Sequence, residues 1–152
     1  MQHAANLFTL KFLLGIIALS LFAQGQSPLA NPVGVWQTID DKTGQVRGTV
    51  KLYAEGDEVF GRIASSINPK DATDICDLCP GDRKNKPIMG LVILRRMKQT
   101  GSEWGGGDIL DPDTGSIYRC KFRMMENGAK MTLRGYLGVS LLGRSQIWIR
   151  QR

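Results

Sequence analysis

Histidine is almost absent from this 152-residue chain, which contains one, at position 3. His3 precedes Lys11 and the uncharged apolar run Phe12–Ala23, which is short for a bilayer-spanning helix and is typical of a secretory signal peptide. Removal of residues 1–25 would leave an exported protein without histidine. That absence excludes mechanisms that need an imidazole as base, acid or metal ligand.

A phosphate-binding loop is also lacking. Gly105–Gly107 is followed by neither a helical pattern nor the lysine that such a loop needs. An acid and base pair for catalysis would have to come from Asp108, Asp111 and Asp113. Asp111 and Asp113 flank Pro112 in a turn, however, where aspartate usually caps its own backbone. No serine has a base to activate it. We therefore expect a protein that is not an enzyme and needs no cofactor.

The expected boundaries follow from the N-terminal pattern. Small residues at Ala23 and Gly25 favour cleavage after Gly25, with Ala23 as the second choice. We expect a signal peptide at 1–25, a lead at 26–33 and one domain at 34–152, in a periplasmic or secreted protein. The alternative is an uncleaved membrane anchor. No cysteine follows the apolar run, so we expect no lipoprotein anchor.

The composition is that of a basic globular protein. Hydrophobic residues make up 42% of the chain and charged residues 22%, and the net charge is +6. Loss of Lys11 with the signal peptide would leave 6 − 1 = +5. An exported basic protein seldom meets nucleic acid, so we expect no nucleic-acid partner, and the charge favours anionic envelope material or solubility.

The domain contains a series of short strand patterns and no useful helical stripe. Alternating polarity and turn residues predict eight strands, at residues 34–40, 45–54, 59–67, 89–98, 104–110, 117–125, 130–138 and 144–150. Most are joined by hairpin turns, including an Asn-Gly signal at 127–128. Eight such strands predict an all-β fold, an eight-stranded antiparallel up-and-down β-barrel whose interior holds side chains or one small ligand.

Strand alternation also predicts which apolar residues face the barrel interior and line a ligand site. These candidates are Val50, Leu52, Ile63, Leu91, Ile93, Tyr118, Phe122, Met131 and Leu133.

Two features resemble the calycin and lipocalin group. Trp36 follows Gly34 in the first strand, and Arg150 lies near Trp148 in the last. In that group the first-strand tryptophan closes one end of the barrel and a late arginine packs over its ring. The resemblance implies that Trp36 and Arg150 close this barrel, with Arg144 as the alternative arginine.

A longer set of motifs is similar to the bacterial family called domain of unknown function 2147, whose members are exported proteins of lipocalin-like fold. The resemblance implies no agreed activity, but a role in binding a small apolar molecule. The motifs are Gly34-x-Trp36, Val59-Phe-Gly61-Arg62-Ile63, Lys86-Pro87-Ile-Met-Gly90-Leu91, Trp104-x-Gly106-Gly107-x-Ile-Leu-Asp111-Pro112, Gly115-x-x-Tyr118, Leu133-Arg134-Gly135-Tyr136 and Leu142-Gly143-Arg144-x-x-x-Trp148.

The cysteines leave three readings open. An oxidising compartment favours a structural disulfide between Cys76 and Cys79. A redox pair is the second reading, but no helix pattern follows to lower a thiol pKa. The third is a metal site that adds Cys120 and a carboxylate, for which the candidates are Asp74, Asp77 and Asp82. We expect the disulfide, no metal, and a buried free thiol at Cys120.

Basic residues gather in the long loop at 68–87. If this loop caps the barrel, Arg83, Lys84 and Lys86 form an entrance patch for the polar end of a lipid-like ligand. The sequence therefore predicts an exported protein that binds a small hydrophobic or amphipathic molecule. The alternatives are a thiol–disulfide redox protein or sensor using Cys76 and Cys79, and a structural envelope protein with a filled barrel.

Overall fold

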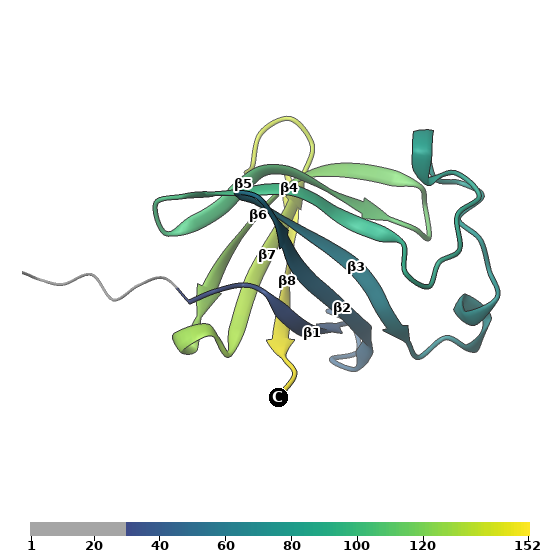
Figure 1. Cartoon of the computed structure of the whole chain (residues 1–152), viewed down its shortest axis with the longest axis horizontal. Helices are drawn as coiled ribbons and strands as arrows, with labels where there is room; N and C mark the ends of the chain where they lie inside the picture. The colour runs from purple at the N-terminus through teal and green to yellow at the C-terminus, as the bar shows by residue number, and fades with distance from the viewer. Residues whose placement is uncertain (1–29) are drawn as a thin grey trace, which may run out of the picture.

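The computed structural model describes residues 30–152, which form a closed antiparallel barrel of eight strands (Figure 1). The predicted fold is thus confirmed, while the predicted signal peptide lies outside the described residues. The strands are β1 (Gly34–Ile39), β2 (Val46–Glu55), β3 (Glu58–Ser66), β4 (Val92–Thr100), β5 (Glu103–Asp111), β6 (Ser116–Met125), β7 (Lys130–Tyr136) and β8 (Gly143–Arg150).

Consecutive strands pair throughout, and β8 returns to β1 to close the barrel. This last seam is short, since it joins only Trp36–Thr38 to Trp148–Arg150. Closure leaves no free sheet edge in the described chain. Among residues 30–152, no helix is long and apolar enough to cross a membrane.

The strand bounds differ from the predicted ones where the backbone must turn. β4 begins at Val92 instead of position 89, because Gly90 has a φ of 85° and donates its N–H to the Ile63 carbonyl at 3.0 Å. The predicted Asn-Gly hairpin is a longer turn. Glu126, Asn127 and Gly128 all have positive φ values there, which a two-residue turn would not need.

Glycines allow the sheet to curl. The strand pairing is irregular at Gly61, where the register shifts on both sides of its pairing with β4. A Cβ atom at this position would lie 2.6 Å from Leu52 Cδ2 and 3.1 Å from Leu94 Cβ, so a larger residue would collide with the core. Position 61 therefore accommodates only glycine, because the barrel wall bends inward there.

The two ends of the barrel differ. The β1–β2, β3–β4, β5–β6 and β7–β8 connections meet at one end, called the mouth below, because the strands alternate in direction. The remaining turns, residue 30 and the C-terminus meet at the other end, called the closed end. In Figure 1 the β3–β4 loop and the β5–β6 turn lie together on the right, and residues 30–33 and the β4–β5 turn on the left.

Trp36 and Arg150 seal the closed end. Trp36 is fully buried, and its Nε1 donates to the Pro32 carbonyl at 2.9 Å. The Arg150 guanidinium lies 4.4 Å from the centre of the Trp36 ring. It also donates to the carbonyl oxygens of Gly128, Val33 and Asn31, at 2.7, 2.8 and 2.5 Å. One side chain thereby ties the lead, the β6–β7 turn and the last strand together.

The barrel interior next to this seal is solid. Trp104 stacks on Phe122 with ring centres 5.2 Å apart. Leu94, Met97 and Met131 are fully buried in the same apolar cluster. Large side chains from several strands therefore fill this half, as expected for a barrel of eight strands.

Candidate functional site

A cavity of about 370 Å³ occupies the mouth half of the barrel. Its apolar wall consists of Val50, Ile63, Ile88, Ile93, Ile109, Leu110, Leu133, Leu137, Leu142 and Trp148. Its polar lining includes Thr38, Tyr118, Tyr136 and Gln146. The volume lies at the lower end of the range for small-molecule sites, roughly 300–1,000 Å³.

Five of the nine residues predicted to line a ligand site do line this cavity. They are Val50, Ile63, Ile93, Tyr118 and Leu133. They come from β2, β3, β4, β6 and β7, so the cavity lies within the ring of strands and not in a surface groove.

The other four predicted residues lie elsewhere, which corrects the sequence-based list. Leu52, Leu91, Phe122 and Met131 do not line the cavity, and all are buried in the apolar cluster. Alternation identified their burial correctly. It gave no information on height along the barrel axis, and Leu52, Phe122 and Met131 in the filled half face inward just as residues of the hollow half do. Leu91 directly precedes β4 at the mouth end, where it packs in the cluster without lining the cavity.

Polar groups inside the cavity are few. Trp148 Nε1 donates to Gln146 Oε1 at 3.2 Å, which orients this amide on the wall. Tyr118 and Tyr136 are half-buried lining residues, and neither hydroxyl has a hydrogen bond to another residue of the described chain. These two residues are therefore the candidates in the lining for bonding a polar group of a ligand. A mostly apolar wall with a few polar groups suits an apolar molecule that carries one polar group.

Ion pairs surround the mouth. Arg47, at the start of β2, reaches Asp113 of the β5–β6 turn at 2.9 Å. Since β2 and β5 are separated by two strands, this pair spans the opening. Arg144 pairs with Asp41, and the hydrogen bond from its guanidinium lowers the pKa of this carboxyl. The charged lining residues are thus of both signs.

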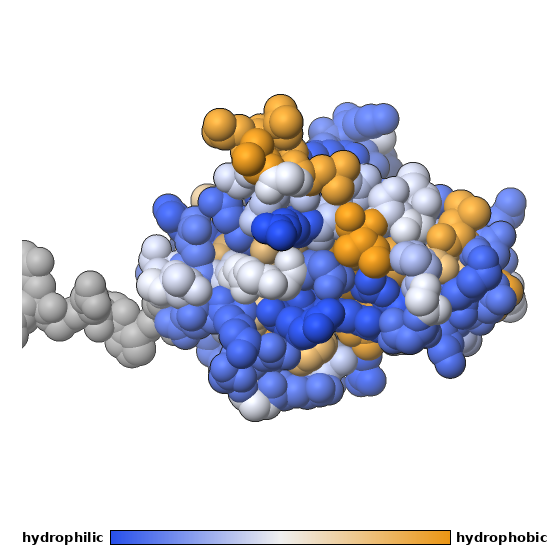
Figure 2. Space-filling view, turned by 90° about the horizontal axis from the view of Figure 1, so that it is seen from above, coloured by the Kyte–Doolittle hydropathy of each residue, from blue (hydrophilic) through white to orange (hydrophobic). Residues whose placement is uncertain are grey.

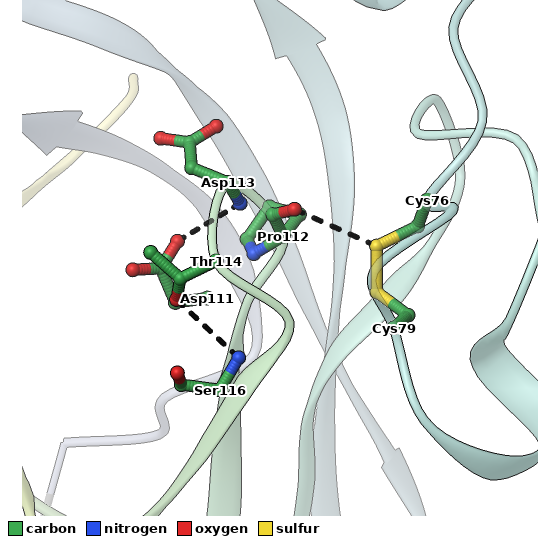
Figure 3. Close-up of a disulfide and its surroundings, with 7 residues drawn as sticks. All are labelled: Cys76, Cys79, Asp111, Pro112, Asp113, Thr114 and Ser116. Carbon is green, nitrogen blue, oxygen red and sulfur yellow. Dashed lines mark hydrogen bonds between the residues drawn. A yellow bond between two sulfur atoms is a disulfide. The ribbon is translucent and has the colours of Figure 1, made fainter.

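The Cys76–Cys79 pair packs beside this opening. The two sulfur atoms form a disulfide with the Cα atoms 5.3 Å apart, and both residues are 1% exposed. Figure 3 shows the bond against the β5–β6 turn, where Cys76 Sγ lies 3.6 Å from the Pro112 carbonyl oxygen. A Cβ atom on Gly115 would lie 2.1 Å from the Leu78 carbonyl oxygen, so the loop and the turn are in close contact.

The predicted basic entrance is not formed, which is a second correction. None of Arg83, Lys84 and Lys86 lines the cavity. Arg83 is 4% exposed and pairs with Asp108 of β5 at 3.3 Å. Asp108 is neighbour in the chain to the cavity residue Ile109 and faces the opposite side of the strand, so Arg83 lies on the outer wall.

The same loop has a second anchor on the outer wall. Arg95 of β4 makes a two-pronged ion pair with Asp82, at 3.0 and 2.8 Å. This hydrogen bond lowers the pKa of the Asp82 carboxyl. The loop charges are therefore used to hold the loop on β4 and β5. Of the connection between β3 and β4, only Asp71 and Ile88 line the cavity.

Cys120 is a buried free thiol on β6, where it pairs with Gly135 of β7. Burial raises the pKa of this thiol, so it stays protonated and unreactive at neutral pH. It lies on β6, apart from the disulfide loop. Among residues 30–152 no cluster of histidine, cysteine and carboxylate side chains is suited to hold a metal ion.

Several cavity residues were missed by the sequence prediction. Gln146 and Trp148 alternate on the inner face of β8, a signal that was present in the sequence. Ile109 pairs directly with Tyr118, but the three glycines before it obscured the alternation of β5. Nothing in the sequence indicated that Arg47 lines the cavity. It lies on the polar face of its strand, and it meets its partner Asp113 only once the barrel has closed.

Comparisons with known proteins agree with this architecture. Residues 34–150 match the model of a family described as an uncharacterised protein conserved in bacteria, DUF2147. Among solved structures, the chain resembles protein HP1028 of Helicobacter pylori, which is described as belonging to the lipocalin family. The TM-score is 0.70 at 17% identity, over 81% of this chain and 84% of the other. No curated protein matches the sequence.

Proposed function

The chain belongs to the bacterial family DUF2147 and has a lipocalin-like barrel, and from this premise we propose that it binds one small apolar or amphipathic molecule in the mouth half of the barrel. The observation that carries the proposal is the cavity of about 370 Å³ among strands that are otherwise tightly packed. Core interiors rarely leave such a volume empty, because voids cost stability.

The lining indicates the chemistry of the ligand. Ile63, Ile93 and Leu133 offer an apolar wall to the body of the molecule. The hydroxyls of Tyr118 and Tyr136 can bond a polar group nearer the opening. Because the rim carries paired charges of both signs, we favour a ligand whose polar end is neutral or weakly charged over a strongly anionic one.

Two alternatives have less support. A thiol oxidoreductase needs an accessible cysteine at the start of a helix, whereas Cys76 and Cys79 are each 1% exposed within a packed loop. A purely structural protein with a filled barrel would have no use for the cavity. The disulfide, in this proposal, keeps the β3–β4 loop against the β5–β6 turn and so maintains the shape of the opening.

The test is a titration with the uncharged fluorescent probe N-phenyl-1-naphthylamine. We expect saturable binding to the wild type and its loss in Gly135→Leu. Gly135 lines the cavity, and a Cβ atom there meets its nearest neighbours at an ordinary 3.5 Å, so the leucine would extend into the space. Gly105→Leu is the matched control, since Gly105 lies outside this cavity and its nearest neighbour is 3.7 Å away.

Absence of saturable binding to the wild type, or equal binding to both leucine variants, would refute the proposal. Native mass spectrometry of the protein purified from its own source gives a second readout. It should detect a bound molecule that organic solvent removes.

We further propose that the protein works outside the cytoplasm after cleavage near Gly25. The apolar run Phe12–Ala23 and the disulfide support this location. The test is N-terminal sequencing of the protein from fractionated cells. A chain that still begins at residue 1 and stays in the cytoplasm would contradict the proposal.

A further inference from the structure

The β7–β8 connection exposes an unusual amount of apolar surface. It consists of residues 137–142, called the apolar loop below. Leu137, Val139, Leu141 and Leu142 are 62%, 59%, 87% and 72% exposed. The connection projects at the top of Figure 1, and the same side of the molecule, seen from above in Figure 2, carries a protruding hydrophobic cluster. Soluble surfaces rarely present four such side chains together without a partner.

Hydrogen bonds hold the apolar loop in this exposed form. Arg134 donates to the carbonyl oxygens of Ser140 and Leu141, at 2.6 and 3.0 Å, and to Ser145 Oγ at 2.9 Å. Leu142 N also donates to the Val139 carbonyl at 3.1 Å. The Arg134 guanidinium thus bonds the loop backbone, while the apolar side chains of the loop stay exposed. The loop is thus ordered before it meets any partner.

The apolar loop belongs to an apolar end of the molecule. Leu137 and Leu142 also line the cavity, so the loop surface is continuous with the ligand site. Most of the exposed large hydrophobic residues of the described chain lie near this mouth. They are Val46, Ile67, Ile75, Leu78, Ile117, Leu137, Val139, Leu141 and Leu142.

We propose that the apolar loop inserts into the surface of a lipid bilayer and places the barrel mouth against it. A stable protein interface involves roughly 20–30 residues on each side, far more than this six-residue loop supplies. Shallow insertion of a few apolar side chains into the interfacial region has no such requirement. A second copy of the chain is therefore a poorer fit than a membrane.

The charges around the apolar loop suit contact with lipid. The rim charges nearest the apolar loop are paired, as in Arg144–Asp41, so contact with lipid need not strip an isolated ion of water. Docking on an uncharged lipid surface is therefore expected, with little dependence on salt.

The experiment places a fluorescent label at the tip of the loop. In the full chain, Leu141→Cys is labelled with the environment-sensitive dye NBD and mixed with vesicles of pure phosphatidylcholine. The buried Cys120 and the disulfide do not compete for the label. We expect a blue shift, a several-fold rise in emission, and quenching by phosphatidylcholine that carries a spin label in its acyl chain. Asp57→Cys, in the β2–β3 turn at the closed end, is the control and should not respond.

Three outcomes would overturn the proposal: no response at Leu141, a response at Asp57 but not at Leu141, and a Leu141 response that depends on protein concentration without vesicles. The last would indicate a second copy. The first two remain informative even if the N-terminal apolar run itself binds vesicles, because the labels report which end of the barrel contacts lipid.

A second variant separates docking from ligand binding. Val139→Ser with Leu141→Ser changes two residues of the apolar loop that do not line the cavity. Vesicle affinity of the barrel mouth is read from an NBD label on Ser140→Cys. We expect this affinity to fall at least tenfold, because each leucine or valine buried in lipid contributes substantially to partitioning. Met125→Ser, an exposed apolar residue at the closed end, is the control. Binding of N-phenyl-1-naphthylamine should survive in both, so docking and the cavity function can fail independently.

Discussion

Replacement of Arg150 by methionine tests whether one side chain seals the closed end of the barrel. Methionine keeps an apolar stem of similar length against Trp36 and removes the guanidinium. The wild-type group makes three hydrogen bonds to backbone carbonyls and lies 4.4 Å from the Trp36 ring centre. Burial lowers the pKa of Arg150, but an arginine remains charged at any ordinary pH.

The expected loss can be estimated from these contacts. Each hydrogen bond contributes about 1 kcal/mol net, and the contact of the cation with the ring about 1 kcal/mol. The bonds to Val33 and Asn31 are near solvent, so water replaces part of their value. We expect Arg150→Met to lower the free energy of unfolding by about 3 kcal/mol. Arg150→Lys should recover about 1 kcal/mol, because one ammonium restores the charge but cannot reach carbonyls on two separate segments.

Urea unfolding followed by tryptophan fluorescence provides the measurement. With a slope of about 2 kcal/mol per M, the midpoint of Arg150→Met should fall by about 1.5 M. Arg152→Met, at the exposed end of the chain, is the control and should leave the midpoint unchanged. A fall of less than about 0.5 M for Arg150→Met, or equal stability of the lysine and methionine variants, would refute the reasoning.

Three further predictions concern the mouth. Replacing Cys76 and Cys79 together by serine should cost about 2 kcal/mol by the loop-entropy relation for so short a ring, measured by urea unfolding without reductant, and an unchanged midpoint would contradict it. Gly115→Ala should cost about 2 kcal/mol more than Gly44→Ala in the same assay: both glycines have a φ of 70°, but a methyl group at 115 collides with the loop backbone, whereas nothing lies within 4 Å of one at 44. Equal losses of stability in the two variants would show that the loop backbone moves aside for the methyl group at little cost. Asp41→Asn tests pH dependence: the lowered pKa of Asp41 means that its pair stabilises the fold above the ordinary value of 3.8 and is lost as pH falls below it. The melting temperatures of wild type and variant should therefore differ most well above the ordinary pKa of 3.8 and converge as the pH falls below it, and a constant difference would contradict the assignment.

The division of the barrel into a filled and a hollow half explains why one fold serves both stability and binding. Trp36, Trp104 and Phe122 supply bulk at the closed end. Toward the mouth, Gly135 and smaller aliphatic residues line the wall instead. The free-energy cost of leaving a cavity unfilled is therefore confined to the mouth half of the barrel.

The sequence by itself determined the local structure. Alternation and turn residues identify eight strands to within a few residues, because side chains on successive strand positions face opposite sides. The Trp36 and Arg150 contact and the Cys76–Cys79 disulfide follow from short motifs and lie where the motifs indicate. In each case the information is contained in a few residues near one another in the chain, or in a family pattern.

Only the tertiary structure decided where the cavity lies and what surrounds it. Val50 and Leu52 have the same signature in the sequence, yet Val50 lines the cavity and Leu52 is buried in the core, because height along the axis depends on strand tilt and register. Arg83 is basic and lies in a loop, which predicts a solvated charge, but closure of the barrel brings Asp108 within 3.3 Å and buries it on the outer wall. Such long-range pairs arise from the folded geometry and leave no local pattern in the sequence.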